Sequence, residues 1–262
     1  MTEEEILLLQ AVLNNPDEDP PRLDYANWCR EQIDESTRAR ADFIRTQIML
    51  VRQFNNLTYE DWFDAVHLEK RLRQTYSAGW AGTIATLVED FTFNRGFIEM
   101  VTVSARRFLE NAEQLLALAP IRHLKLTEVR SAASELFVSP YLGDIISMEI
   151  ERCGLNDEYL KMLAESPVLK HLKWLSVAEN DIGLDGADAL AGSDLSKQLV
   201  YVNFYGNPVD PGGQYSRDNE LIIDSWLPET GQQLEAKHGY LGWLHRNADT
   251  VYEAVPDRFR LT

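Results

Sequence analysis

Histidine and cysteine are the side chains that most often bind metals or act as nucleophiles, and this sequence has few of them. Five histidines and two cysteines are spread over 262 residues. No histidine pairs with a cysteine or with a second histidine at the spacing of a metal site. His238 and His245 are 7 residues apart and could share a helix face. We expect them to be exposed to solvent or packed against other side chains, and not to bind a metal. The sequence therefore predicts no metal and no other cofactor.

Motifs for covalent or phosphate chemistry are also absent. The sequence contains no G-x-S-x-G nucleophile elbow, no phosphate-binding loop and no G-x-G-x-x-G. Its 42 acidic residues offer many carboxylates, but no spacing among them identifies a catalytic pair. A hydrolase whose site is assembled only in space is the remaining enzymatic alternative. We therefore expect a protein that is not an enzyme, and we assign no catalytic residue.

Cys153, Asn180 and Asn207 stand at a fixed interval of 27 residues, which indicates a structural role. Each occupies the N/C position of the pattern L-x-x-L-x-L-x-x-N/C-x-L. The amide or thiol at this position can hydrogen-bond buried backbone where the chain bends after a strand. We therefore interpret these three side chains as a structural ladder and not as reactive groups.

The segments around this ladder form leucine-rich repeats. Each copy begins as a strand, and runs such as GLDGADALAG return the chain as a helix. Two looser copies precede the three regular ones, so about five repeats occupy residues 91–212. One repeat cannot bury its own apolar stripe, and neighbouring repeats must therefore stack. The predicted fold is an α/β leucine-rich repeat solenoid with a helical convex side.

Side chains between the core leucines of each strand should point to the concave face of this solenoid. Trp174 and Tyr201 fall at the same place one repeat apart, and Tyr205 follows on the same strand. Aromatic residues dominate binding hot spots. The candidate partner-binding residues are Trp174, Tyr201, Tyr205, Glu149, Glu151, Glu179, Lys125 and His123. The alternative is that the C-terminal segment, which contains Trp226 and Trp243, folds over this patch.

The net charge of −17 is spread along the chain, and no segment offers a basic stripe. Binding to nucleic acid or to an anionic membrane is therefore not expected. The acidity either maintains solubility or favours a basic protein or peptide as partner. No apolar run approaches the ~20 residues of a membrane span. The acidic start, MTEEEILLLQAVL, is unlike a signal peptide, so we expect a cytoplasmic protein.

The first 90 residues are predicted to be helical and to cap the open end of the solenoid. Apolar residues recur at helical spacing on both sides of the break NNPDEDPP. Thr58 and Asp61 resemble a capping box, which predicts a helix over residues 58–76. A separate binding function for these helices is the alternative. Residues 213–262 are expected to form an irregular C-terminal cap.

This N-terminal segment resembles the repeat-companion domain found at the N-terminus of many bacterial leucine-rich repeat proteins. The matching residues are Pro21, Arg22, Leu23, Tyr25, Ala26 and Trp28 in PRLDYANW, with Phe43, Ile44, Arg45 and Gln47 in FIRTQ. Asn27 and Cys29 depart from the family pattern. The later segments RGFIEMVTV, LAPIRHLKL and LEAKHGYLGWLH also look like parts of such proteins. The resemblance implies a domain layout, but it implies no particular activity.

These patterns predict a non-catalytic module that binds a protein or peptide through the concave face of its repeats, as an adaptor or recognition subunit. The alternative is an accessory subunit of a larger enzyme or defence complex, docked through the N-terminal helices. Because one repeat scaffold supports many unrelated functions, the predicted fold alone does not decide between them.

Overall fold

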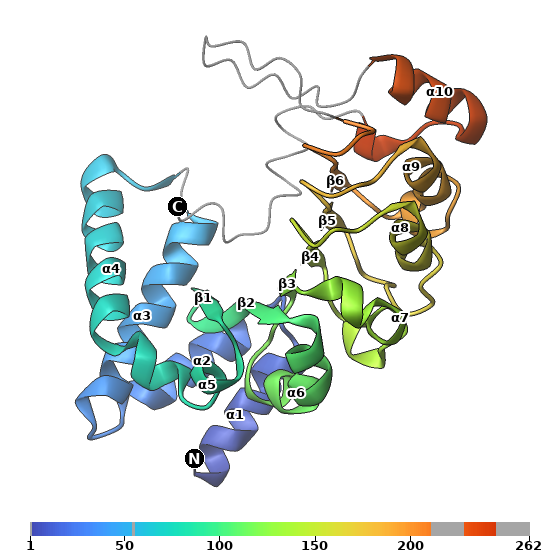
Figure 1. Ribbon diagram of the computed structural model, residues 1–262. Helices are drawn as coiled ribbons and strands as arrows, with labels where there is room; N and C mark the ends of the chain where they lie inside the picture. Colours follow the sequence, from blue (N-terminus) through green and yellow to red (C-terminus); the bar gives the residue numbers. More distant parts are fainter. Residues whose placement is uncertain (1, 54–55, 211–227, 245–262) are drawn as a thin grey trace. The chain divides into compact units, whose positions relative to one another are not determined.

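The computed structural model describes residues 2–53, 56–210 and 228–244, and it confirms the predicted mixed α/β class. Ten α-helices and six strands lie in these ranges, and the strands form one sheet in the order β1 to β6 (Figure 1). Strands β3 to β6 pair in parallel. No helix in these ranges is long and apolar enough to cross a membrane.

The described chain divides into two compact units, with α6 (Ala105–Leu118) and β2 (Phe97–Ser104) contributing to both. The other elements of the first unit are α1 (Glu3–Asn14), α2 (Pro20–Arg30), α3 (Glu35–Arg52), α4 (Tyr59–Ala81), α5 (Ile84–Leu87) and β1 (Asp90–Asn94). Those of the second unit are β3 (His123–Thr127), α7 (Ala133–Leu136), β4 (Ser147–Glu149), α8 (Asp157–Ala164), β5 (Trp174–Ser176), α9 (Leu184–Ala191), β6 (Tyr201–Asn203) and α10 (Pro228–His238).

Short polar residues and prolines set where the N-terminal helices begin. The Thr58 hydroxyl accepts a hydrogen bond from Asp61 N at 3.1 Å and caps α4. The predicted helix over residues 58–76 is therefore confirmed, and it continues to Ala81. Two prolines open α2, where a missing backbone N–H removes no helical hydrogen bond.

A two-residue turn joins β1 to β2 and packs tightly against α3. Arg95 and Gly96 have φ angles of 48° and 86°, as a type I′ hairpin turn requires. A Cβ atom on Gly96 would lie 2.2 Å from Cγ1 of Ile44, so only glycine fits there. The backbone N–H of Gly96 donates to Oε1 of Gln47 at 2.7 Å. The backbone of the turn is therefore in direct contact with α3.

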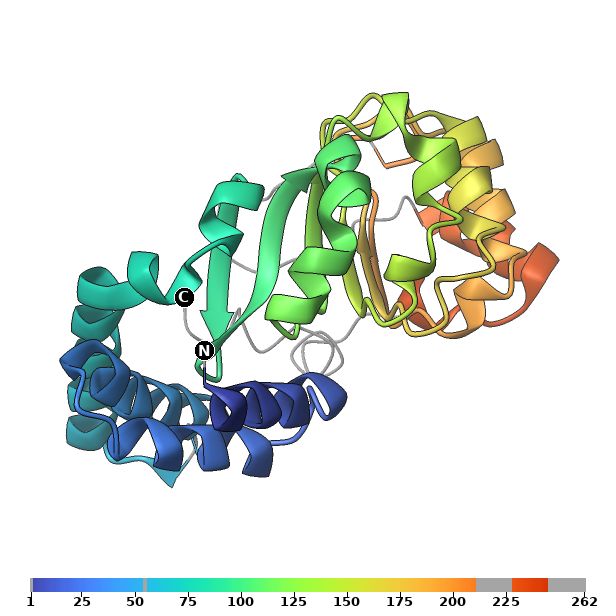
Figure 2. The ribbon, with the colours of Figure 1, turned by 90° about the horizontal axis from the view of Figure 1, so that it is seen from below.

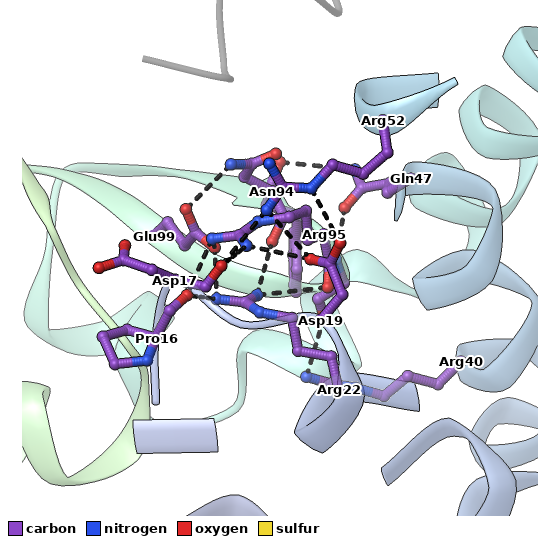
Figure 3. Close-up of polar contacts among 12 residues, drawn as sticks. Pro16, Asp17, Asp19, Arg22, Arg40, Gln47, Arg52, Asn94, Arg95 and Glu99 are labelled. Atoms are coloured by element: carbon purple, nitrogen blue, oxygen red, sulfur yellow. Dashed lines mark hydrogen bonds and ion pairs between the residues drawn. The ribbon is translucent and has the colours of Figure 1, made fainter. Parts of the chain in front are cut away.

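Buried charges hold the same turn from its other side (Figure 3). Arg22 is 0% exposed, and its Nη2 lies 2.6 Å from Oε1 of Glu99. Arg95 contacts the same carboxylate at 3.0 Å and reaches Oδ1 of Asp19 at 3.1 Å. Both guanidinium groups also donate to the carbonyl of Pro16, at 2.6 and 2.8 Å. Each buried cation is thus paired with an anion and hydrogen-bonded to backbone.

In the second unit, the register of the parallel strands places apolar side chains 24 or 27 residues apart opposite each other. Leu124, Met148, Leu175 and Val202 are paired in register across β3 to β6. Each of these four side chains is at most 1% exposed. The 27-residue interval predicted from the sequence thus joins Met148, Leu175 and Val202 in a column of core side chains, and Leu124 extends this column at an interval of 24 residues.

Helices α7, α8 and α9 lie side by side along one face of strands β3 to β6 (Figures 1 and 2). In each strand, alternate side chains point to opposite faces of the sheet. The core column therefore faces these helices, and the neighbouring positions face the other way. We call that opposite surface the strand face.

Asn180 hydrogen-bonds the backbone of two successive turns after the strands. Its Oδ1 accepts from Cys153 N at 2.9 Å and from Leu155 N at 3.1 Å. Its Nδ2 donates to the carbonyls of Ile150 and Val177, both at 2.8 Å. The side chain is 6% exposed, so it serves polar groups that water does not reach.

Asn207 repeats this arrangement one turn later. Its Oδ1 accepts from Ile182 N at 3.0 Å, and its Nδ2 donates to Val177 O at 2.8 Å and Phe204 O at 2.9 Å. Cys153 stands 27 residues before Asn180, and its Sγ lies 3.5 Å from Leu126 O.

A left-handed residue precedes the ladder position in each of these turns. Glu128, Arg152, Glu179 and Gly206 have φ angles of 52°, 54°, 55° and 74°. Only glycine adopts this conformation without steric cost. In three of the four turns, a residue other than glycine therefore occupies this strained conformation at the same place.

Helix α10 packs against α9 at the end of the second unit. Asp188 accepts from Lys237 Nζ at 2.6 Å and lies 2.8 Å from Nε2 of His238. Trp243 is 0% exposed and donates its Nε1–H to Ser196 Oγ at 2.9 Å. Residues 211–227 and 245–262, which include most of the predicted C-terminal cap, lie outside the described residues.

Replacing Glu99 with Gln should destabilise the protein by about 3–5 kcal/mol, because it leaves buried Arg22 without its anion. Chemical denaturation of wild-type and variant measures this difference. Glu113→Gln, at an exposed position of α6, is the matched control and should change the free energy of unfolding by less than about 0.5 kcal/mol. Equal stability of the two variants would show that the ion cluster contributes nothing.

Replacing Asn180 with Ala should cost about 2–4 kcal/mol, because buried N–H and C=O groups in two turns lose their partner. Asn156→Ala removes only the N-cap of α8 and should cost about 1 kcal/mol. Thermal and urea unfolding of both variants tests the order. If Asn156→Ala is less stable than Asn180→Ala, then Asn180 does not hold the two turns as described.

Candidate functional site

The strand face carries two columns of side chains set by the strand register. The first column is His123, Ser147, Trp174 and Tyr201, which are direct neighbours across β3, β4, β5 and β6. The second is Lys125, Glu149, Ser176 and Asn203. Most of the residues proposed from the sequence as partner-binding thus come from adjacent strands of one sheet.

Trp174 and Tyr201 form a parallel stack. Their ring centroids are 5.0 Å apart and their planes differ by 7°. Trp174 is 8% exposed, whereas Tyr201 and Tyr205 are half-buried. The accessible part of the aromatic group therefore belongs to the two tyrosines, and Trp174 backs the ring of Tyr201.

A chain of hydrogen bonds crosses β5 and β6 beside the stack. Asn203 Nδ2 donates to Ser176 Oγ at 3.2 Å, and Ser176 Oγ donates to Glu151 Oε1 at 2.5 Å. Asn203 Oδ1 also accepts from the backbone N–H of Tyr205 at 3.0 Å. These bonds fix the Glu151 carboxylate and the backbone of Tyr205 relative to each other. Ser176 and Asn203 were not selected from the sequence, because small polar residues on a strand carry no distinctive pattern.

Two of the three glutamates on this face are paired with bases. Lys125 Nζ lies 3.6 Å from Oε2 of Glu149. Arg152 binds Glu179 through two hydrogen bonds, Nε to Oε2 at 2.5 Å and Nη2 to Oε1 at 2.6 Å. The hydrogen bonds from Arg152 hold the pKa of Glu179 below its ordinary value. The paired charges largely cancel, which leaves Glu151 as the carboxylate that gives this surface a negative charge.

His123 and Glu149 are less accessible than a partner-binding role requires. His123 is 3% exposed and Glu149 is 8% exposed. A partner in contact with Tyr201 and Tyr205 would reach Glu151 before either of them. Trp226, in the segment expected to cover this face, lies outside the described residues. Trp243 packs beside Phe204 with a ring-centroid distance of 6.1 Å.

Neither cysteine has the surroundings of a reactive thiol. Burial raises the pKa of the Cys29 thiol to about 12, above its ordinary value. Burial also raises the pKa of Cys153, against hydrogen bonds to the backbone of Val129 and Glu128 that lower it. Among the described residues, no group of three or more His, Cys, Asp or Glu side chains could hold a metal ion.

Replacing Arg152 with Ala should raise the pKa of Glu179 toward its ordinary value, because the hydrogen bonds that favour the carboxylate are lost. In the wild-type protein the ion pair is present at neutral pH and is lost as the pH falls through the lowered pKa of Glu179. Carboxyl NMR titration measures the shift. Lys161→Ala, on α8, is the control and should leave the Glu179 titration unchanged. Identical titrations in all three proteins would contradict the pairing.

Comparisons with protein-family models, with curated proteins and with solved structures found no match to this chain. The resemblance to repeat-companion proteins therefore has no support beyond the residues quoted above. Tyr205, expected on the same strand as Tyr201, instead follows the end of β6, just as Glu151 follows the end of β4. The case for a function depends on the strand face itself, where these two half-buried tyrosines and the oriented carboxylate of Glu151 are found.

Proposed function

We propose that the second unit belongs to a leucine-rich repeat solenoid and that its strand face, the concave side of that solenoid, binds a protein segment or peptide. The observation that carries this proposal is the stacked pair Trp174 and Tyr201, held in strand register with Tyr205 close by. A ring that is already fixed loses little conformational entropy when a partner packs on it. Such rigid aromatic anchors are typical of binding hot spots.

The solenoid part of the proposal rests on features that recur in successive turns. The core column, the asparagine side chains and the left-handed residue each return at the same place. Parallel strands on one side and helices on the other are what stacked repeats of this length produce.

The partner that fits this surface carries an aromatic or apolar side chain next to a lysine or arginine. Tyr201 and Tyr205 supply the apolar contact. Glu151 supplies the charge, because Ser176 orients its carboxylate and the neighbouring Arg152, whose two hydrogen bonds go to Glu179, attracts it only at longer range. A charged hydrogen bond to an oriented carboxylate adds specificity as well as affinity.

Selection from a displayed library of random peptides tests this function. The wild-type protein should enrich basic peptides, and the double variant Tyr201→Ala/Tyr205→Ala should bind them at least 10-fold more weakly. Glu151→Gln should weaken the binding of peptides that contain lysine or arginine and should leave the binding of peptides without them unchanged. Tyr159→Ala, a half-buried tyrosine on α8, is the matched control and should bind as wild-type does. Enriched peptides that bind all four proteins equally, or no enrichment at all, would contradict the proposal.

Docking through the N-terminal helices is the second candidate, and one observation favours it. Tyr59 is 75% exposed and Phe63 is 43% exposed, one turn apart on α4, with ring centroids 6.1 Å apart. His67 extends this row, with its ring 4.0 Å from that of Phe63. An exposed aromatic row on one helix face suits contact with another protein.

The two functions are separated by variants that leave the buried core intact. Because α1 and α2 contribute buried residues such as Val12, Ala26 and Cys29, deleting them would unfold the unit and decide nothing. Tyr59→Ser/Phe63→Ser changes only exposed side chains. Proteins that copurify with the wild-type chain would be identified and compared with those of this variant. If they are lost in the variant while peptide binding is unchanged, the accessory role is favoured over the peptide-binding one.

A further inference from the structure

The first unit contains a cavity of about 360 Å³, within the size range of small-ligand sites. It is lined from α1, α2, α3, the C-terminal end of α4, α5, β2 and the C-terminal end of α6. Its wall combines two charged side chains, Glu5 and Arg40, with the rings of Tyr25, Trp80 and Phe97. This cavity is independent of the strand face and of the function proposed for it.

Arg40 is half-buried, and it differs from the buried residues Arg22 and Arg95 because it is not paired with an anion in the described chain. No carboxylate lies within 4.0 Å of it in the described chain, whereas Arg22 and Arg95 share Glu99. Its two Nη atoms donate to backbone carbonyls at 3.4 Å each, which is long for such bonds. Its Nε is buried without a hydrogen-bond partner. The guanidinium group therefore keeps donor capacity that a carboxylate could use.

Aromatic rings surround the Arg40 guanidinium. Its Cζ lies 5.4 Å from the ring centroid of Phe97, 5.7 Å from Trp80 and 5.8 Å from Tyr25. Cation–π attraction fixes the group in place without neutralising its charge. The same rings give the cavity an apolar wall on which an aromatic or aliphatic side chain can pack.

Glu5 places a negative charge elsewhere on the cavity wall. Its Oε1 accepts from the Tyr25 hydroxyl at 3.1 Å, and it has no basic partner among the described residues. Tyr25 thus contacts both charged residues, Glu5 through its hydroxyl and Arg40 through its ring. An unpaired cation and an unpaired anion in one cavity suit a ligand that carries both charges.

We propose that this cavity binds a free α-amino acid with an aromatic or large apolar side chain. The ligand carboxylate would bind Arg40, its ammonium group would bind Glu5, and its side chain would pack among Tyr25, Trp80 and Phe97. A ligand with only one of the two charges would leave the opposite residue partly buried and unpaired. It would therefore bind more weakly.

Gly79 provides a variant that closes the cavity and still folds. It lines the cavity, and a Cβ atom added to it would meet no atom within 4 Å. It also lies inside α4, where any residue with a side chain other than proline favours the helix over glycine. Gly79→Leu should therefore fold stably and fill the cavity. Ala78→Leu adds the same side chain at the preceding position, which is exposed like Gly79 but does not line the cavity, and it is the matched control.

Isothermal titration with L-phenylalanine, 3-phenylpropionate and phenethylamine tests the proposal on the full chain. Phenylalanine should bind wild-type and Ala78→Leu equally, and binding to Gly79→Leu should be lost. Phenylpropionate, which lacks the ammonium group, and phenethylamine, which lacks the carboxylate, should each bind at least 10-fold more weakly. Arg40→Gln should lose phenylalanine binding, whereas Arg38→Gln, at an exposed position of α3, should keep it.

Three results would overturn the proposal. The first is no measurable heat with phenylalanine at millimolar concentration. The second is unchanged binding to Gly79→Leu, which would place the ligand elsewhere. The third is equal affinity for phenylalanine and either single-charge analogue, which would remove the role of Glu5 or of Arg40. None of these results depends on whether the strand face binds peptides.

Discussion

Backbone carbonyls and N–H groups that are buried outside the helical and strand ladders must find side-chain partners, and both units of this protein depend on that requirement. In the first unit, Arg22 and Arg95 reach the carbonyl of Pro16, and Gln47 holds the N–H of Gly96. In the second, Asn180 and its equivalent serve the turns after the strands. Each unmet group would cost about 1–3 kcal/mol, so these few side chains decide whether the turns form.

The two units meet this requirement with different chemistry. Guanidinium groups offer several donors but bring a charge, so the first unit must also bury carboxylates such as Glu99. The amide of Asn180 offers donors and an acceptor without a charge, and it can therefore be repeated at every turn. An uncharged group suits a repeated position, because stacked turns place equivalent side chains close together.

Much of the fold could be predicted from the sequence, because it depends on local patterns. The cap at Thr58, the strand-and-helix alternation and the 27-residue register each leave a periodic or positional signature. The pairs that involve Glu99 and Arg152 leave none, since they join residues whose proximity is set only by the folded backbone. For the same reason the sequence placed Glu179 among the charges available to a partner, whereas the structure pairs it.

The cavity beside Arg40 could not be predicted either, because its wall comes from elements far apart in the chain. PRLDYANW signals a buried helix, and nothing in it indicates that Tyr25 contacts both Glu5 and the guanidinium group of α3. The positive φ angles before the ladder positions were also missed. Glycine fits that conformation, and Gly206 shows that the turn accepts it.

Arg152 and Glu179 retain side chains where glycine would relieve backbone strain, and their mutual pairing does not explain that choice. Exposed ion pairs contribute little to stability, because water solvates both charges when they separate. The strain of the left-handed conformation is larger than such a gain. Glu128 adopts the same conformation one turn earlier, so the strain belongs to the turn and not to the ion pair. Under the proposed function, a partner packed on Tyr205 would also meet Glu179, whose backbone N–H donates to the carbonyl of Tyr205, and that contact would give the side chain a use that glycine could not supply.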